Sequence, residues 1–179
     1  NNKEAYFFEK KINMKNYEKK INFKLSKNQK FIEYSETGID YLKKISDIIK
    51  INTGGILIID YGYSNIKMKN TLQSISRHRY SNILKNIGDS DITHNISFSL
   101  FKKIIKNLNG LKDNLTTQKE FLIKMGIYER AEIISRNQSF LKKADIYYRL
   151  KRLVDDKQMG KLFKVMLIKN KKNKFKLGF

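Results

Sequence analysis

The sequence predicts an α/β fold in which a helix leads into a buried central strand. Apolar residues recur at helical spacing at Ile39, Leu42, Ile45 and Ile49. The run GILIID, residues 55–60, follows them closely. Because this run is apolar without alternation, we expect both of its faces to be covered, as in a central strand of an α/β sheet. A helix followed by such a strand is half of a doubly wound unit.

Length and composition allow one domain with a hydrophobic core, or part of a larger domain. The chain has 179 residues and no cysteine, which excludes disulfides and cysteine-based metal sites. No apolar run approaches the roughly 20 residues of a membrane-spanning helix. The first residues, NNKEAYFFEKK, lack the apolar core of a secretion signal. Because the sequence begins with Asn1 and not with Met, we expect a fragment or a processed chain.

The chain is strongly basic, with a formal net charge of +21. Such a charge is typical of proteins that bind nucleic acid or anionic surfaces. The excess is almost all lysine, however, and it is spread over every segment beside abundant Asn, Ile, Tyr and Phe, which indicates a codon bias. A phosphate-binding face would instead cluster Lys and Arg with exposed aromatic residues. Nucleic-acid binding is therefore the less favoured interpretation.

The sequence of the first part of the chain predicts two or three strands, followed by a helix. The stretches typical of a hairpin-like strand pair and of a short third strand are AYFFEKKI (5–12), KINFKL (20–25) and FIEYSE (31–36). Thr37 and Asp40 resemble a capping box at the start of the helix that follows. Gly54 and Gly55 suit the end of that helix.

The strand 55–60 ends in an acid, Asp60, which Tyr61 and Gly62 follow. The carboxyl ends of the strands line the ligand crevice of an open α/β sheet, so these residues are candidates for a functional site. The alternative is that Asp60 only caps the turn after the strand. The residues alone leave both interpretations open.

Residues 64–95 are predicted to form a long polar loop. The loop holds both histidines, His78 and His94, together with Asp89 and Asp91. Their spacing matches no closed arrangement of metal ligands, so we predict no metal site. Loops of this length in a compact domain are nevertheless more often functional than idle.

The second half of the chain predicts helices and strands. An apolar stripe from Phe98 to Leu108 predicts a helix that Gly110 ends. Thr117 and Glu120 form a second capping box, ahead of the helical segment QKEFLIKM. The other expected elements are strands at GLKDNLT (110–116) and LFKVMLIK (162–169) and helices over 127–135 and 138–154. We expect the aromatic side chains of the last helix, such as Phe140 and Tyr147, in the core.

The order of several motifs resembles that of one protein family. GGILIIDYGY is followed by TLQSISRHRY, then by GDSDIT, TQKEFL, MGIYERA and MGKLFKVM. Each piece is weak alone, but the succession with short gaps is specific. It is similar to the MidA family of S-adenosylmethionine-dependent methyltransferases, which are related to the mitochondrial complex I assembly factor that methylates arginine. The resemblance runs from about Glu33 to Met166.

The resemblance implies a class I methyltransferase fold, which is Rossmann-like, with a mainly parallel sheet and helices on both faces. The chain would be the C-terminal part of this single domain. Residues 1–35 would form a strand-rich insertion, and residues 36–179 the fifth to seventh strands with their helices. The family's Gly-Pro-Gly cofactor loop has no counterpart in the sequence, so the half that binds S-adenosylmethionine would be missing. Alone, the chain would bind this cofactor poorly or not at all.

The resemblance also carries over candidate site residues, while the cofactor-binding residues stay unknown. The catalytic residues would be Asp60, Tyr61 and Gly62, and the substrate-pocket residues would be His78, Asp91 and Thr93. Asp60 would orient a substrate guanidinium, Tyr61 would stack on the substrate, and Gly62 would allow a close approach. Ser97 departs from the family, which usually has an acid there, although serine can still cap the helix that follows.

These inferences predict a protein methyltransferase that modifies arginine, is linked to respiratory complex I assembly and is active only with the upstream half. Its partner would be a protein substrate, with a complex I subunit as the candidate. We expect it in the cytoplasm of a bacterium or in the mitochondrial matrix of a eukaryote. The alternative is a non-catalytic fragment or an accessory piece that binds another protein. The oligomeric state stays open.

Overall fold

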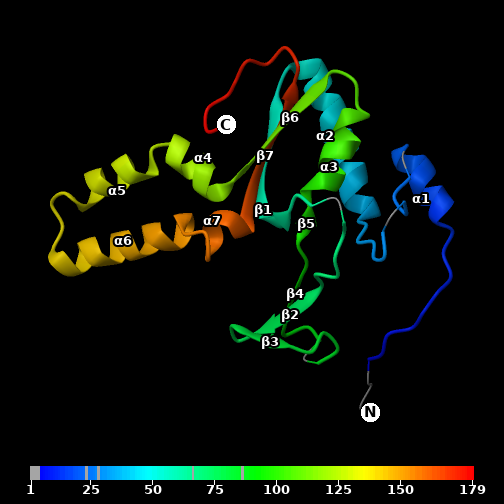
Figure 1. Cartoon of the computed structure of the whole chain (residues 1–179), viewed down its shortest axis with the longest axis horizontal. Helices are drawn as coiled ribbons and strands as arrows, with labels where there is room; N and C mark the ends of the chain where they lie inside the picture. The colour runs from blue at the N-terminus through cyan, green and yellow to red at the C-terminus, as the bar shows by residue number, and fades with distance from the viewer. Residues whose placement is uncertain (1–4, 23, 28, 66, 86) are drawn as a thin grey trace. The chain divides into compact units, whose positions relative to one another are not determined.

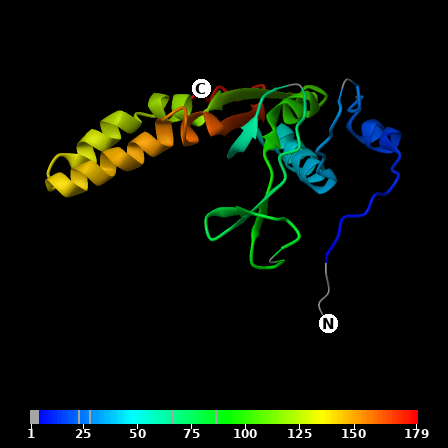
Figure 2. The ribbon, with the colours of Figure 1, turned by 60° about the horizontal axis from the view of Figure 1, so that its bottom comes forward.

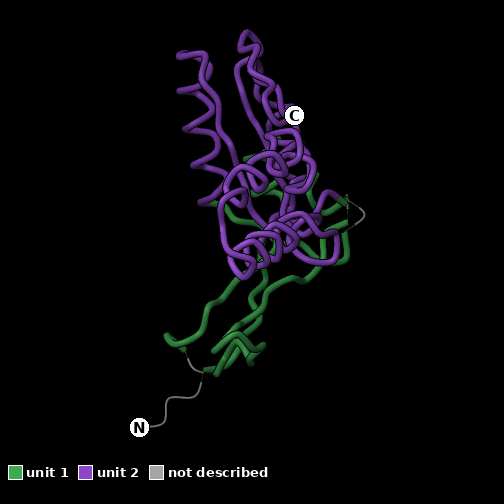
Figure 3. Tube along the Cα trace, turned by 90° about the vertical axis from the view of Figure 1, so that its left-hand side faces the viewer, with its two compact units in different colours: residues 1–36, 65–95 green, residues 37–64, 96–179 purple. Residues whose placement is uncertain are grey.

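The computed structural model describes residues 5–22, 24–27, 29–65, 67–85 and 87–179. The chain divides into two compact units (Figure 3). The first unit comprises residues 1–36 and 65–95, and the second comprises residues 37–64 and 96–179. Each unit has its own sheet, with three strands in the first and four in the second.

The helices and strands are distributed unequally between the two units. The first unit contains α1 (Met14–Ile21), β2 (Gln73–Ser76), β3 (Arg79–Ser81) and β4 (Asp91–Thr93). The second unit contains α2 (Glu36–Asn52, except its first residue), β1 (Gly55–Tyr63), β5 (Ile96–Ser97), α3 (Phe98–Lys106), β6 (Leu111–Thr117), α4 (Gln118–Lys124), α5 (Ile127–Ser135), α6 (Phe140–Val154), α7 (Met159–Leu162) and β7 (Phe163–Asn170).

The sheet of the second unit has the strand order β5-β1-β7-β6 (Figure 1). Strand β7 is antiparallel to both of its neighbours, whereas β5 pairs with β1 in parallel. The strands predicted at GILIID, GLKDNLT and LFKVMLIK are thus confirmed, and one of the last two is antiparallel to the first, as expected.

Strand β7 forms the centre of this unit, with four consecutive apolar residues, 165–168, buried. Because side chains alternate along a strand, Ile168, Asn170 and the cross-strand partner Asp113 share one face. The Asn170 side chain donates to the carbonyls of Ile49 at 3.3 Å and Lys50 at 3.0 Å, near the end of α2. On the same face, Asp113 lies 3.8 Å from the Lys102 ammonium of α3. Both helices therefore cover this face of the sheet.

The opposite face of β1 is open to solvent, so the prediction that both faces are covered is wrong. Leu57 is 49% exposed and Ile59 is 48% exposed, although the residues across from them on β7 are buried. The apolar run was the correct signal for a strand. It does not report which elements of this chain cover the strand.

The described part of residues 1–35 contains no strand, although the sequence predicted a strand-rich insertion there. Residues 5–13 form no regular structure, and α1 follows them. Asn13 caps this helix, because its side chain accepts from the Lys15 backbone N–H at 3.1 Å. Part of the second predicted strand, Phe23, lies outside the described residues.

The third predicted strand and the first predicted capping box are wrong as well. Residues 31–35 form no strand. Helix α2 begins at Glu36, so Thr37 lies inside its first turn instead of capping it. The helix ends at Asn52, just before Gly54, as predicted.

The polar loop predicted for residues 64–95 contains the strands of the first unit, in the order β3-β2-β4. Arg77 and His78 join β2 to β3 and have φ values of 51° and 62°. Two successive positive φ angles are typical of a tight hairpin turn of type I′. The hydroxyls of Ser74 and Ser81 meet at 2.8 Å across the hairpin. The prediction of a loop is therefore wrong over these strands.

Helices α5 and α6 run side by side as a hairpin (Figures 1 and 2). Its buried contacts are made by Ala131, Leu150 and Val154. Phe140 of α6 is nevertheless 84% exposed, and Tyr147 of the same helix is 48% exposed. The prediction that these aromatic residues lie in the core is wrong. The capping box of Thr117 and Glu120 at the start of α4 is confirmed.

No helix within the described parts of the chain is long and apolar enough to cross a membrane.

Candidate active site at the end of strand β1

Asp60 lies inside β1, because the strand continues to Tyr63. The Asp60 side chain is half-buried. Its Oδ1 atom accepts a hydrogen bond from the Tyr61 backbone N–H at 2.8 Å. This hydrogen bond to the next residue is similar to the contact expected if Asp60 only capped the backbone after the strand. A carboxylate offers about four acceptor positions, so Asp60 retains capacity for a second donor.

Lys164 stands opposite Asp60 on β7. Directly opposed side chains of an antiparallel pair lie on the same face. Burial lowers the pKa of Lys164, and the charge of Glu120 partly opposes this effect. The Lys164 ammonium donates to the Lys161 carbonyl. The site therefore has a carboxylate and a basic group as cross-strand neighbours.

Tyr61 lies on the other face of the strand, where its ring meets that of Phe163. The two residues are cross-strand partners, their ring centroids are 5.4 Å apart, and the rings are inclined at 88°. This edge-to-face geometry is favourable for aromatic pairs. It fixes the Tyr61 ring at the point where the β1–β7 pairing ends.

Gly62 is the position of closest packing at this end of the strand. A Cβ atom there would overlap the Ile96 carbonyl oxygen and would lie 2.8 Å from Cε2 of Phe98. The close approach that glycine allows is thus made by β5 and the first residue of α3. Gly62 keeps β1 and β5 together.

Tyr63 and Ser97 place two buried hydroxyls beside these residues. They are partners in the parallel β1–β5 pair. Ser97 occupies the N-cap position of α3, yet its side chain makes no capping hydrogen bond. Its Oγ atom and the Tyr63 hydroxyl are buried without a hydrogen-bond partner in the described structure. Buried polar atoms are usually paired, so these hydroxyls mark a polar position that this part of the chain leaves unsatisfied.

Sequence reasoning did not single out Tyr63. The sequence Tyr61-Gly62-Tyr63 could have identified Tyr63, because side chains alternate along a strand and both tyrosines therefore lie on the same side.

The other predicted site residues belong to the first unit. His78 is exposed in the turn between β2 and β3, and Asp91 is exposed at the start of β4. Thr93 accepts a hydrogen bond from the Gln73 side chain at 3.1 Å. The predicted residues are thus divided between the two units. Within the described segments, no group of three or more acidic or histidine side chains is arranged to hold a metal ion.

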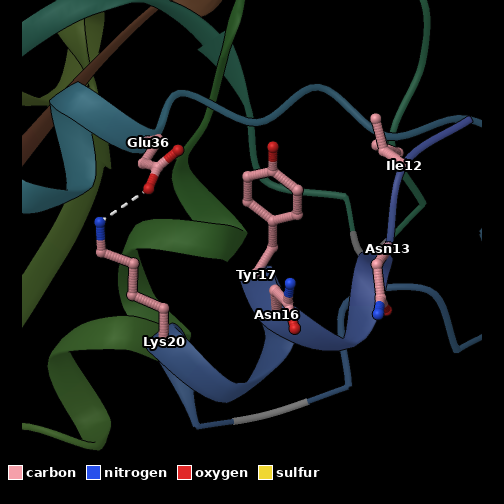
Figure 4. A pocket seen from close by; sticks show the side chains of 6 residues that line it. All are labelled: Ile12, Asn13, Asn16, Tyr17, Lys20 and Glu36. Carbon is pink, nitrogen blue, oxygen red and sulfur yellow. Dashed lines mark hydrogen bonds and ion pairs between the residues drawn. The ribbon is translucent and has the colours of Figure 1, made fainter. Parts of the chain in front are cut away.

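A hollow of about 310 Å³ lies in the first unit, beside α1 (Figure 4). Its lining residues are Ile12, Asn13, Asn16, Tyr17, Lys20 and Glu36. Lys20 and Glu36 form an ion pair of 2.8 Å at one side. The hollow shares no residue with the predicted site.

Comparison with known proteins gives a family match over most of the chain. Residues 3–116 match the family described as "Putative S-adenosyl-L-methionine-dependent methyltransferase". The mitochondrial protein arginine methyltransferase NDUFAF7 of Danio rerio is 25% identical over 136 residues, which cover 76% of this chain and 32% of that protein. The protein of the same name from Xenopus tropicalis is 25% identical over 134 residues, which cover 74% of this chain and 31% of that protein.

Two solved structures from Burkholderia thailandensis share the fold. An uncharacterized superfamily protein superposes with a TM-score of 0.63 at 22% identity, over 81% of this chain and 40% of that chain. A superfamily member bound to S-adenosyl-homocysteine superposes with a TM-score of 0.58 at 24% identity, over 74% of this chain and 37% of that chain. The chain thus spans about a third of the length of the curated relatives and about two fifths of the solved chains.

Proposed function

The chain belongs to the MidA family of S-adenosyl-L-methionine-dependent methyltransferases, and from this we propose that it forms the C-terminal part of a protein arginine methyltransferase. The observation that carries the proposal is the half-buried Asp60 carboxylate, which a backbone hydrogen bond holds near the end of β1. The names of the relatives from Danio rerio and Xenopus tropicalis support arginine as the target.

The chemistry of arginine explains why such a carboxylate is useful. A guanidinium is planar and cationic, and a carboxylate can bind two of its N–H groups at once. Such a pair orients the group, and positioning supplies much of the rate in a displacement reaction. In this proposal Asp60 binds the guanidinium and Gly62 lies on the same face of the strand, whereas the Tyr61 ring lies on the other face, against Phe163. His78, Asp91 and Thr93 belong to the first unit, and their role as substrate-pocket residues stays a prediction.

In this proposal the described residues do not by themselves form a site for S-adenosylmethionine. Gly54 precedes β1 and Gly55 begins it, whereas a cofactor loop of this fold follows a strand. The space beside Gly62 is filled by Ile96 and Phe98. The proposed residues therefore act only on the substrate side of the reaction, and the cofactor needs the part of the domain that this chain does not span.

The test is to combine the chain with the segment encoded upstream of it, together with radiolabelled S-adenosylmethionine and candidate proteins. A complex I subunit is the first substrate to try, because the related assembly factor acts in that pathway. We expect label in methylarginine after acid hydrolysis. Label in another amino acid alone would refute the arginine assignment, and absence of label with every candidate would refute the enzyme assignment for those substrates.

A non-catalytic accessory role is the second candidate function. By the resemblance, Ser97 stands where the family usually has an acid, and its hydroxyl is buried without a partner in the described structure. The loss of an acidic residue is expected in an active site that no longer catalyses the reaction. Calorimetry with S-adenosyl-homocysteine on the recombined protein distinguishes the two functions. Tight binding would speak against decay, and no binding would favour the accessory role.

A further inference from the structure

Helix α6 carries two apolar stripes on different sides. The first stripe takes part in the contacts with α5, and it is formed by Ile146, Leu150, Leu153 and Val154. The second stripe follows the i, i+1, i+4, i+7, i+8 spacing of one side of a helix, and it is formed by Phe140, Leu141, Ala144, Tyr147 and Tyr148. All five of these residues are exposed. We call these five residues the outer stripe.

The outer stripe is most exposed where α6 begins, just after the turn from α5. Leu141 is 79% exposed beside Phe140, and Ile133 in the last turn of α5 is 60% exposed. The joined ends of the two helices are the part of the hairpin farthest from the sheet of the same unit (Figures 1 and 2). Contiguous exposed apolar side chains of this kind usually mark a surface that contacts a protein or a membrane.

The charges of the hairpin are mainly positive. Residues 127–154 contain seven lysines and arginines but only three acidic residues. Two of these acids already pair within the hairpin, Glu132 with Arg136 at 3.9 Å and Asp145 with Arg149 at 2.9 Å. The hairpin therefore complements a surface that carries negative charge.

The side chains change in character along the side of α6 that carries the outer stripe. Phe140 and Leu141 come first, the two tyrosines follow, and Lys151 and Arg152 come four residues after them. Because a helix rises 1.5 Å per residue, Tyr148 lies about 10 Å and Arg152 about 16 Å beyond Leu141 along the axis. This order matches the layers of a lipid surface, in which tyrosine is enriched between the acyl chains and the water.

We propose that the outer stripe is a membrane-binding surface that attaches the protein to anionic lipid. Phe140 and Leu141 enter the lipid layer, and the lysines and arginines of the hairpin bind the headgroups. The attachment is to one face of the membrane, since no helix in the described part of the chain could span it. The inference does not depend on the proposed function.

The first experiment measures binding to vesicles by co-sedimentation, with the chain alone and with the chain combined with its upstream-encoded segment. The vesicles are phosphatidylcholine, either pure or with about 30% phosphatidylglycerol, in about 0.15 M salt. We expect binding to the anionic vesicles to exceed binding to pure phosphatidylcholine at least tenfold. Equal binding to both would overturn the role of the cations.

A substitution that changes no charge separates insertion from simple attraction of a basic chain. Phe140→Ser combined with Leu141→Ser should lower binding to the anionic vesicles at least tenfold, because two large apolar side chains no longer leave water. Phe175→Ser with Leu177→Ser is the matched control, since these two residues are 53% and 57% exposed outside the hairpin. Equal binding of all three proteins, or equal loss in both variants, would overturn the proposal. Circular dichroism checks that each variant retains its fold.

The position of the inserted side chain can be measured directly, because the chain has no cysteine and one introduced cysteine is labelled uniquely. A polarity-sensitive dye on Leu141→Cys should shift to the blue on the anionic vesicles and be quenched by spin labels on the acyl chains. The same dye on Leu177→Cys should show neither change. A dye at Leu141→Cys that stayed in water would overturn the insertion.

Two other occupants of the outer stripe give different results. If the combined protein did not bind the vesicles although the chain alone did, the stripe would be covered by the rest of the domain. If the wild type sedimented as a dimer that Phe140→Ser with Leu141→Ser dissociated, and the dye did not enter lipid, the stripe would be an interface between two copies. Either result would overturn the membrane assignment.

Discussion

Asp60 and Lys164 stand opposite each other across the antiparallel β1–β7 pair, and each hydrogen-bonds to a backbone group. The Asp60 carboxylate accepts from the Tyr61 N–H, and the Lys164 ammonium donates to the Lys161 carbonyl. The carboxylate is thereby oriented by the strand itself. Substitution can separate the negative charge of Asp60 from its hydrogen bond to the Tyr61 backbone.

Asp60→Asn keeps an oxygen that can accept from the Tyr61 N–H, but it removes the charge that would bind a guanidinium. In the recombined enzyme we expect kcat for arginine methylation to fall about 100-fold or more, which is the usual scale for loss of one catalytic group. The free energy of unfolding should change by less than about 0.5 kcal/mol. Labelled methyl transfer and urea unfolding measure the two effects.

Asp60→Ala is the companion variant, because it also removes the hydrogen bond to Tyr61. We expect it to lower the free energy of unfolding by about 1 kcal/mol in addition to its effect on kcat. Full activity in Asp60→Asn would exclude a charge-dependent role for this residue.

Gly62→Ala tests the close packing of β1 against β5 and α3. The added methyl would overlap the Ile96 carbonyl oxygen and crowd the Phe98 ring, so we expect a loss of about 1 to 3 kcal/mol in unfolding free energy. Gly54→Ala is the control, since no atom lies within 4 Å of a Cβ at that position. Urea unfolding of both variants provides the comparison. Equal stability of the two would show that β5 can move away from β1 at little cost.

The elements that the sequence predicted correctly have local signals. Strand β1 has an uninterrupted apolar run, and α4 has the reciprocal side-chain bonds of Thr117 and Glu120. Each signal is contained in fewer than about ten residues, so no information on distant packing was needed. This explains why three of the four strands in the main sheet were predicted.

The missed elements depend on features that the usual signals do not cover. The turn between β2 and β3 has Arg77 and His78 at positive φ, where Asn-Gly or Asp-Gly would have predicted a hairpin. Helix α1 has an asparagine cap but aromatic flanks typical of strands. In the candidate site, the contacts of Gly62 and the burial of the Ser97 hydroxyl depend on the β1–β5 pairing, which the sequence alone does not reveal.

Ser97→Ala should differ from an ordinary capping substitution. Replacing a serine or threonine cap by alanine usually costs about 1 kcal/mol. Ser97 makes no capping bond, and its hydroxyl is buried without a partner in the described structure, so its removal should be neutral or slightly stabilising. Thermal unfolding followed by circular dichroism measures the change.

Thr117→Ala is the matched control for that variant. The Thr117 Oγ1 atom accepts from the Glu120 backbone N–H at 3.2 Å, and we expect its loss to cost about 1 kcal/mol. If Ser97→Ala cost as much as Thr117→Ala, the Ser97 hydroxyl would have a partner in solution.

Lys169→Met tests a lysine that is only 1% exposed near the end of β7. Burial, and then the charges of Lys112 and Lys176, lower the pKa of Lys169 below its ordinary value of 10.5. Between the two pKa values the unfolded chain binds more protons than the folded chain, so the stability of the wild type rises with pH in that window. We expect Lys169→Met to be more stable than the wild type at pH 7, with an advantage that shrinks towards pH 10.5.

The exposed Lys171 is the control for this lysine, because Lys171→Met removes a charge without relieving burial. Urea unfolding from pH 6 to pH 10.5 on both variants and the wild type gives the pH dependence. If the advantage of Lys169→Met did not vary with pH, or if the variant were less stable than the wild type at pH 7, the buried ammonium would have to find a compensating partner in solution. The same dependence in Lys171→Met would point to net charge as the cause, because that substitution changes the charge of the chain equally while leaving β7 intact.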